Sequence, residues 1–399
     1  MAQRVHKLKY IIILSICLLF VGCSTKLSLE DTIEKSKHID NKGNETRHSQ
    51  IIESPNKKSL EKSIQEITIS AVGDILIHDR VYNDALIEKN RYDFTPMLAP
   101  VKKYLNDTTI TFANQETMIG GTEIGLSTYP MFNSPKEVGE ALKDAGVNIV
   151  SLANNHTLDR GEEAIQSAIR HWNDMDMMYV GAYKDKEDQR ALRVMETDEG
   201  ISVAFLASTY GTNGIPVPKG KDYLVNLIDK EKIASEIEAA KEVADATIIS
   251  LHFGNEYERM PSEDQKELVQ FVADQGADVV LGTHPHVLQP IEWITGKDGN
   301  ETLVAYSLGN FLSGQKGLYR QIGGVLKFKI MKANFAGKEK ISIELPAFMP
   351  TYNASENETN YRVLPMHETT ENILPDVREH EKQIKNHMSQ WLPELEFIK

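Results

Sequence analysis

The stretch VNIVSLANNHTLDRGEEAIQSAIRHW, residues 147–172, joins an apolar run, a polar turn and a helical pattern in direct succession. Its first part is apolar and β-branched, which predicts a buried strand. The part after Gly161 has the apolar spacing of an amphipathic helix. Between them stand Asn154, Asn155 and His156. Such side chains at a strand end cap a turn, satisfy backbone groups, or hold a metal and a substrate, and the rest of the chain decides between these roles.

Strand-like and helical patterns alternate along the chain, which predicts an α/β fold. Two of the helices are predicted to begin with capping boxes, one from Ser134 to Glu137 and one from Ser262 to Gln265. After about Gly323 the pattern changes to period two, which predicts antiparallel strands, and residues 376–392 have the pattern of one amphipathic helix. The runs that predict the earlier strands are residues 66–74, 108–116, 147–156, 201–208, 246–254, 277–284 and 302–310.

The N-terminal segment has the features of a secretory signal. Three basic residues precede an apolar stretch that is too short for a comfortable membrane span, and this stretch ends in Phe20-Val21-Gly22-Cys23. These four residues resemble a bacterial lipobox. Residues 1–22 are therefore predicted to be a lipoprotein signal peptide and Cys23 the lipidated residue. The alternative is an uncleaved signal anchor.

The segment that follows is polar and has no aromatic residue, so residues 23–65 are predicted to form a flexible tether. The folded part is expected to comprise a domain of residues 66–330. Residues 331–399 would complete it with strands and an amphipathic helix. We expect a protein held by lipid on the extracytoplasmic face of the cell membrane.

Charge and cysteine content exclude some classes of function. The formal net charge of −14 argues against a nucleic-acid partner, because no basic excess is available to displace phosphate counterions. Of the two cysteines, Cys17 lies in the predicted signal peptide and Cys23 at its end, so no thiol remains for a disulfide or a nucleophile. Any metal site must therefore use His, Asp, Glu and Asn side chains.

Polar residues gather at the ends of several predicted strands. In open α/β sheets, ligands bind outside the carboxyl ends of the strands, so these side chains are expected to face one crevice. Mixed imidazole, carboxylate and amide ligands favour Mn, Zn or Fe over calcium. Glu116 is the candidate for a carboxylate that bridges two divalent cations, and one or two ions are expected. The residues concerned are Asp74, Asn114, Glu116, Asn154, Asn155, His156, His252, His284 and His286.

Six motifs in order carry a family resemblance: GDILIHD, NQET, ANNHTLDRG, LHFGNEYE, GTHPH and YSLGNF. Together they resemble the poly-γ-glutamate capsule-synthesis (CapA/PgsA-like) family, which is related to calcineurin-like metallophosphoesterases and 5′-nucleotidases. The resemblance covers roughly residues 67–323. It implies a four-layer α/β/β/α sandwich with a small C-terminal extension.

The resemblance also implies roles for single residues. Asp74 and His286 would bind a first metal. Asn155, His252 and His284 would bind a second, with Glu116 between the two. His156 would assist the leaving group or, with Asn155, stabilise developing charge, and Asp159 would orient its loop.

Two positions depart from the pattern of phosphoesterases. Thr157, the residue after His156, stands where they often have Glu or Asp. Leu76 stands where they usually carry a histidine ligand, two residues after the first-strand aspartate. The first metal is then short of a ligand unless His78 reaches it. We regard His78 and Asn114 as supporting residues.

The resemblance implies a membrane-anchored protein that acts in the synthesis, export or anchoring of poly-γ-glutamate or another anionic cell-envelope polymer. Membrane-bound capsule-synthesis subunits would be its protein partners. If the site is catalytic, activated water would attack a phosphoryl or carbonyl centre. One alternative is a non-catalytic polymer-binding or assembly subunit, which the Leu76 substitution favours. A weaker alternative is a surface nucleotide phosphatase.

Overall fold

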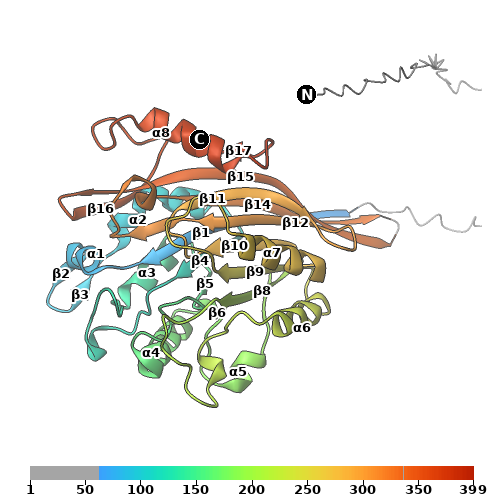
Figure 1. The fold of residues 1–399 in the computed structure, drawn as a ribbon, viewed down its shortest axis with the longest axis horizontal. Coiled ribbons are helices and arrows are strands. Elements are labelled where there is room, and N and C mark those ends of the chain that lie inside the picture. The colour runs from blue at the N-terminus through green and yellow to red at the C-terminus, as the bar shows by residue number, and fades with distance from the viewer. Residues whose placement is uncertain (1–62, 336) are drawn as a thin grey trace, which may run out of the picture. The chain divides into compact units, whose positions relative to one another are not determined.

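The structure, a computed structural model, describes residues 63–335 and 337–399. The predicted signal peptide, the lipidation of Cys23 and nearly all of the predicted tether lie outside these residues. Most of the described chain forms two β-sheets with helices around them (Figure 1). The prediction of an α/β fold is confirmed.

The first sheet has nine strands, with β1 in its middle. On one side of β1 the strands β4, β5 and β6 run parallel to it. On the other side β14, β15 and β16 alternate in direction, each antiparallel to its neighbour. In sheet order the strands are β16 (Thr359–Pro365), β15 (Lys338–Glu356), β14 (Ile322–Phe335), β1 (Ser63–Leu76), β4 (Ile110–Gln115), β5 (Ile149–Ser151) and β6 (Met178–Val180), with β13 (Asn310–Ser313) beside β1 and β17 (Glu396–Phe397) beside β15.

The second sheet has six strands, of which the four inner ones are parallel and the two edge strands antiparallel. In sheet order they are β11 (Leu288–Thr295), β12 (Glu301–Leu308), β10 (Val279–Thr283), β9 (Ala246–His252), β8 (Ser202–Thr209) and β7 (Arg193–Glu196). A separate hairpin consists of β2 (Leu86–Glu88) and β3 (Arg91–Tyr92).

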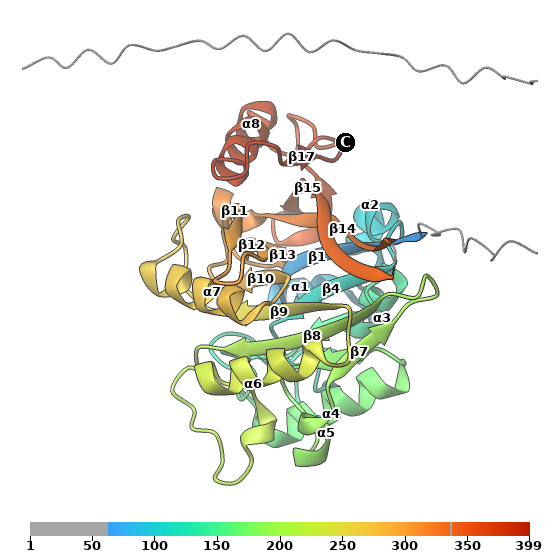
Figure 2. The ribbon, with the colours of Figure 1, turned by 90° about the vertical axis from the view of Figure 1, so that its right-hand side faces the viewer.

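The two sheets pack face to face, and helices cover their outer faces (Figure 2). Between the sheets, the stacked rings of Phe112 and Phe205 lie 6.3 Å apart. Helices α2 to α4 pack on the first sheet, α6 and α7 on the second, and α8 against β11 and β15. The helices are α1 (Asp79–Asp84), α2 (Thr95–Leu105), α3 (Glu137–Asp144), α4 (Gly161–Asp174), α5 (Lys186–Arg190), α6 (Lys230–Lys241), α7 (Glu263–Gln275) and α8 (Val377–Met388), with short 3-10 turns at Thr122–Ile124, Asp222–Leu224 and Leu318–Gln321.

One of the two predicted capping boxes is present. Ser262 Oγ accepts a hydrogen bond from the backbone of Gln265, whose side chain accepts one in return, and α7 ends at Gly276 with φ 91°. The box predicted at Ser134 is wrong, because α3 begins only at Glu137 and has no side-chain cap. Ser134 instead donates its hydroxyl to Thr117 Oγ1 at 2.8 Å, as part of the loop after β4.

The C-terminal part of the chain belongs to the main sheet. Strand β14 pairs with β1 from Ser63↔Asn334 to Val72↔Val325. The predicted boundary at residue 330 therefore falls inside a strand, and the first strand starts three residues before the predicted position. Among the described residues, no helix has both the length and the apolar character needed to cross a bilayer.

Candidate metal centre

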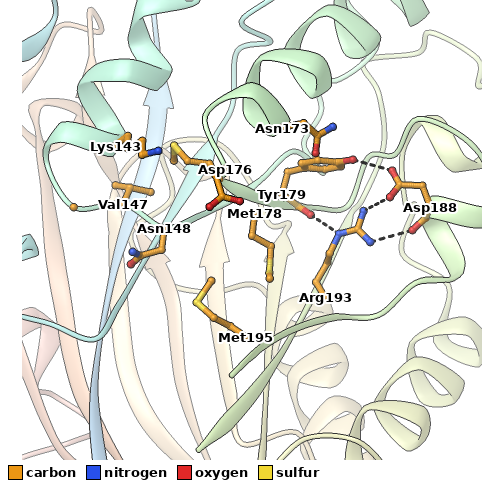
Figure 3. A pocket seen from close by; sticks show the side chains of 12 residues that line it. Lys143, Val147, Asn148, Asn173, Asp176, Met178, Tyr179, Asp188, Arg193 and Met195 are labelled. Atoms are coloured by element: carbon orange, nitrogen blue, oxygen red, sulfur yellow. Dashed lines mark hydrogen bonds and ion pairs between the residues drawn. The ribbon is translucent and has the colours of Figure 1, made fainter. Parts of the chain in front are cut away.

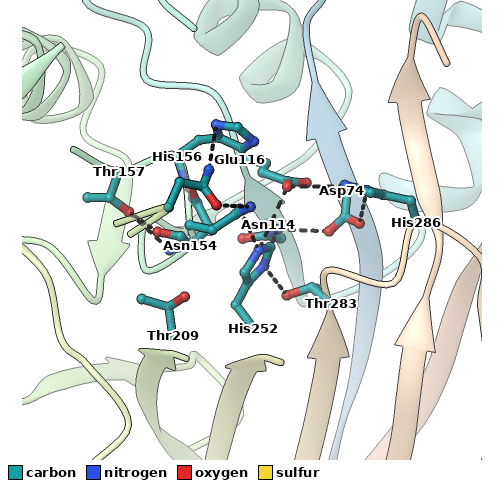
Figure 4. A network of polar contacts seen from close by, with 12 residues as sticks. Asp74, Asn114, Glu116, Asn154, His156, Thr157, Thr209, His252, Thr283 and His286 are labelled. Atoms are coloured by element: carbon teal, nitrogen blue, oxygen red, sulfur yellow. Dashed lines mark hydrogen bonds and ion pairs between the residues drawn. The ribbon is translucent and has the colours of Figure 1, made fainter. Parts of the chain in front are cut away.

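The structure brings the six predicted ligands together at the carboxyl ends of strands from both sheets. Figure 4 shows four of them, Asp74, Glu116, His252 and His286. Asp74 lies near the end of β1, Glu116 directly follows β4, and Asn155 lies in the loop after β5. From the facing sheet, His252 ends β9, and His284 and His286 follow β10. All six side chains are buried.

A first group of ligand atoms comes from Asp74, Glu116 and His286. His286 Nδ1 lies 3.1 Å from Asp74 Oδ2, and His286 Nε2 lies 3.6 Å from Glu116 Oε1. The supporting residue Asn114 donates from Nδ2 to Asp74 Oδ1 at 2.8 Å. This hydrogen bond fixes the orientation of the aspartate.

A second group comes from Glu116, His252 and His284. His252 Nε2 lies 3.7 Å from Glu116 Oε1 and 3.0 Å from Asn155 Oδ1. Its other ring nitrogen lies 2.9 Å from Thr283 Oγ1. Glu116 is thus shared by both groups, as its predicted bridging role requires.

Several polar atoms of the centre have no hydrogen-bond partner among the described residues. They are both carboxylate oxygens of Glu116, Nδ1 of His284 and Oδ1 of Asn114. Leaving buried polar atoms unpaired is costly, more so for a charged group. Imidazole and carboxylate donors in this arrangement suit divalent Zn, Mn or Fe, and such a cation would give these atoms the partner they lack.

The electrostatics of the centre favour bound positive charge. Burial raises the pKa of Glu116 well above its usual value, Asp74 raises it further, and His286 opposes both. Burial also lowers the pKa of His252 well below its usual value and that of His284 to about 3. Both rings therefore stay neutral and keep a lone pair for a metal.

His286 differs from the other two histidines. Burial disfavours its charged form, but the carboxylates of Glu116 and Asp74 outweigh burial and raise its pKa to about 9. The two carboxylates therefore attract a positive charge to this point of the centre.

His156 and Asp159 lie beside the two ligand groups. His156 Nδ1 lies 2.7 Å from Asp159 Oδ2, which also accepts the backbone N–H of Phe132 at 2.7 Å. The ring of Phe132 packs edge-on at 4.8 Å from that of His156. His156 and Asp159, together with Asn155 and Asn213, line a pocket of about 410 Å³. The predicted orienting role of Asp159 agrees with this geometry.

Two other residues singled out in the sequence, His78 and Asn154, contact the backbone of neighbouring segments. His78 is buried, but none of the candidate metal groups among the described residues contains it. Its Nδ1 lies 3.1 Å from Leu76 O and 3.3 Å from Gly314 N, which hold the ring. Asn154 connects the β4 and β5 loops, because its Nδ2 donates to Gln115 O and its Oδ1 accepts from His156 N.

Three further residues contact the candidate ligands, and the sequence did not predict these contacts. Asn310 Oδ1 lies 3.1 Å from His286 Nδ1, and Asn213 Oδ1 accepts a hydrogen bond from Asn155 Nδ2 at 3.2 Å. The ring of Tyr210 lies 4.7 Å from that of His284. Asn213 and Tyr210 follow a predicted strand, so their position at a strand end was the available signal.

A larger pocket lies at the opposite, amino ends of β5 and β6 (Figure 3). It measures about 570 Å³, and its arginine, Arg193, is already engaged. That guanidinium donates to Tyr179 O at 3.0 Å and to Asp188 Oδ1 at 2.6 Å. The candidate ligand groups among the described residues lie at the carboxyl ends of the strands, away from this pocket.

Comparison with known proteins agrees with the motifs. Residues 68–315, more than half of the chain, match the family described as "Bacterial capsule synthesis protein PGA_cap". The chain belongs to this family. The predicted family resemblance is therefore confirmed.

Two curated relatives have capsule-related names. The chain is 30% identical over 270 residues to "Capsule biosynthesis protein CapA" of Bacillus anthracis, covering 63% of this chain and 61% of that protein. It is 30% identical over 208 residues to "PGA biosynthesis protein CapA" of Bacillus subtilis (strain 168), covering 52% of this chain and 53% of that protein. The matches thus span less than two thirds of either relative.

Among solved structures, the calcineurin-like phosphoesterase YfkN from Bacillus subtilis aligns with a TM-score of 0.42 at 17% identity. The alignment covers 81% of this chain and 99% of that chain.

Removal of divalent metal is expected to destabilise the protein. A cation that binds only the folded state and is present at about 100 times its Kd adds about 2.7 kcal/mol to the free energy of unfolding. We expect a chelator to lower the melting temperature by several degrees and Mn²⁺ or Zn²⁺ to restore it. Differential scanning calorimetry measures the shift. Identical melting curves with chelator and with Mn, Zn and Fe would contradict a metal centre.

Proposed function

We propose that this protein acts in the synthesis, export or anchoring of poly-γ-glutamate or a related anionic cell-envelope polymer, and that it carries a metal-dependent, hydrolase-like site. The observation that carries this proposal is the buried carboxylate of Glu116 between His252 and His286 in a chain of the capsule-synthesis family. Within the described part of the chain this carboxylate has no hydrogen-bond partner. The printed names of the two curated relatives support the polymer part.

The proposed fold type is the α/β/β/α sandwich of metallophosphoesterases. Its support is that the candidate ligands come from strand ends of two facing sheets. We assign Asp74, Glu116 and His286 to one cation. Glu116, Asn155, His252 and His284 are assigned to a second. Bound cations of this kind supply Lewis acidity toward a phosphoryl or carbonyl oxygen.

His156 is the proposed proton donor at the site. Asp159 Oδ2 is the partner of its Nδ1, which fixes the orientation of the ring, as in other His–carboxylate pairs. In the doubly protonated ring, the proton on the other nitrogen, Nε2, would be the one donated to a leaving group in the adjoining pocket. Asn155 would add an amide donor or acceptor beside it.

The proposed setting is the outer face of the cell membrane. Lipid on Cys23 and the polar segment up to residue 65 would tether the domain there, within reach of the polymer and of membrane-bound synthesis subunits. Support for this comes from the lipobox-like motif and from the family.

Replacement of His156 tests the catalytic part of the proposal. We expect His156→Ala to reduce turnover of poly-γ-glutamate or a model phosphodiester by ~10²–10⁴-fold, as for loss of a general acid. Its metal content should match that of wild type, because His156 belongs to none of the ligand groups. His380→Ala, in helix α8 and outside the candidate ligand groups of the described residues, is the control and should keep full activity.

The outcome also separates enzyme from assembly subunit. Turnover that falls in the His156 variant alone supports the enzyme. If the wild-type protein binds the polymer but turns over no substrate with Mn, Zn or Fe, the hydrolase-like part of the proposal is wrong and a polymer-binding subunit is favoured.

A further inference from the structure

A carboxylate stands on the solvent side of the metal centre. Glu256, in the loop after β9, forms a third group with His284 and His286, and the ligand atoms of these three residues lie within 4.8 Å of one another. Glu256 is exposed, whereas the two histidines are buried. It also lines the 410 Å³ pocket together with Asn155 and His156.

Backbone hydrogen bonds hold the Glu256 loop against the histidine loop. Phe253 N donates to Thr283 O at 3.1 Å, and Tyr257 N donates to Pro285 O at 2.8 Å. The second bond joins the residue after Glu256 to the residue between the two histidines. Farther along, Gln289 Nε2 donates to Glu258 O at 2.8 Å. The position of Glu256 is therefore fixed by the fold on both sides.

The backbone around this contact has an unusual conformation. Tyr257, His284 and His286 have φ values of 68°, 98° and 59°, in the left-handed region that side-chain-bearing residues rarely adopt. Strained residues of this kind cluster at functional sites, where the surrounding structure holds them in place. Here the strain lies in the two loop segments that bring Glu256 to the histidines.

The centre has room for one more ligand. Asp74, Glu116 and His286 provide three donors, and a tetrahedral ion needs four. Leu76, two residues after Asp74, is apolar and offers none. On the other side, His284 Nδ1 is buried and has no hydrogen-bond partner among the described residues.

We propose that Glu256 is an additional metal ligand, which joins His286 on the first cation, beside His284 of the second, and closes the solvent side of the centre. This assignment rests on the metal centre of the proposed function. The nearby Glu258 differs from Glu256. Its side chain accepts a hydrogen bond from Asn255 at 3.1 Å and belongs to none of the candidate ligand groups in the described part of the chain.

The test compares E256Q with the matched variant E258Q in the full-length protein. Calorimetric titration with Mn²⁺ measures affinity and stoichiometry, and the visible spectrum with Co²⁺ reports the ligands directly. We expect E256Q to weaken one binding step by ~10–100-fold or more and to change the Co²⁺ spectrum, since even residues that only orient ligands have effects of this size. E258Q should behave as wild type.

Three results would overturn the inference. Metal affinity and Co²⁺ spectrum of E256Q equal to those of wild type would show that Glu256 is not a ligand. Equal losses in E256Q and E258Q would indicate a general effect of charge. A wild-type protein that binds neither ion would contradict the metal centre itself. Because Glu256 is exposed, E256Q should fold normally, and its melting temperature in chelator should equal that of wild type.

Discussion

Glu116→Gln is expected to prevent the protein from holding two metal ions at once. Glu116 is the carboxylate common to both buried ligand groups, and its Oε1 lies 3.7 Å from His252 Nε2 and 3.6 Å from His286 Nε2. Glutamine keeps the volume but removes the negative charge and one acceptor oxygen. We expect metal affinity to fall by ~10–100-fold or more, the size found even for residues that only orient metal ligands. Elemental analysis of the dialysed protein measures the loss.

The same variant should have the opposite effect on the metal-free protein. Both oxygens of Glu116 are buried without a hydrogen-bond partner among the described residues, so removing the charge removes a desolvation penalty. In chelator we expect E116Q to be more stable than wild type by about 1–3 kcal/mol.

A control for Glu116 lies in the second sheet. Glu292→Gln changes a glutamate of β11 that accepts a hydrogen bond from Tyr306 and does not belong to the centre. It should leave metal content unchanged. If E116Q retains as much metal as E292Q, Glu116 does not bridge the two ligand groups.

Gly73→Ala is expected to destabilise the protein strongly. A Cβ at this position would stand 1.9 Å from the backbone oxygen of Gly309. That oxygen cannot retreat freely, because it accepts a hydrogen bond from Asp74 N at 2.9 Å. A clash with backbone between paired strands belongs to the severe class of substitutions, and we expect a loss of about 3–5 kcal/mol.

Urea denaturation measures this loss. Gly211→Ala is the matched control, because a Cβ there meets no atom within 4 Å and the residue does not have a positive φ. It should change the free energy of unfolding by less than about 0.5 kcal/mol. Equal midpoints for the two alanine variants would show that β1 and the segment around Gly309 can separate without cost.

The sequence was sufficient to predict the class of fold and most of the candidate ligands. Strands and helices have different apolar periods, and these periods can be read within ten or fifteen residues. Polar side chains such as Asp74, Glu116 and His252 come directly after apolar runs, so their place at strand ends is a local property. The same holds for the cap of α7 at Ser262, which depends on residues three apart.

Distances between segments were decided only by the tertiary structure. Asp74 and His286 are 212 residues apart in sequence, and their side chains meet because two sheets pack face to face. Periodicity shows which side of a strand is buried, but it does not show which strand lies beside it or in which register. For this reason the sequence did not show that residue 330 lies inside a strand, β14, which pairs with β1.

The packing of distant segments also decided the positions of His78 and Glu256 relative to the ligand groups. His78 is close to Asp74 in the chain, but the backbone of Leu76 and Gly314 holds its ring outside the ligand groups. Glu256 stands in a polar loop, and hydrogen bonds such as that from Tyr257 N to Pro285 O, made far along the chain, hold it beside the histidines. Local pattern thus determined which residues could bind a metal, and long-range packing decided which of them share one centre.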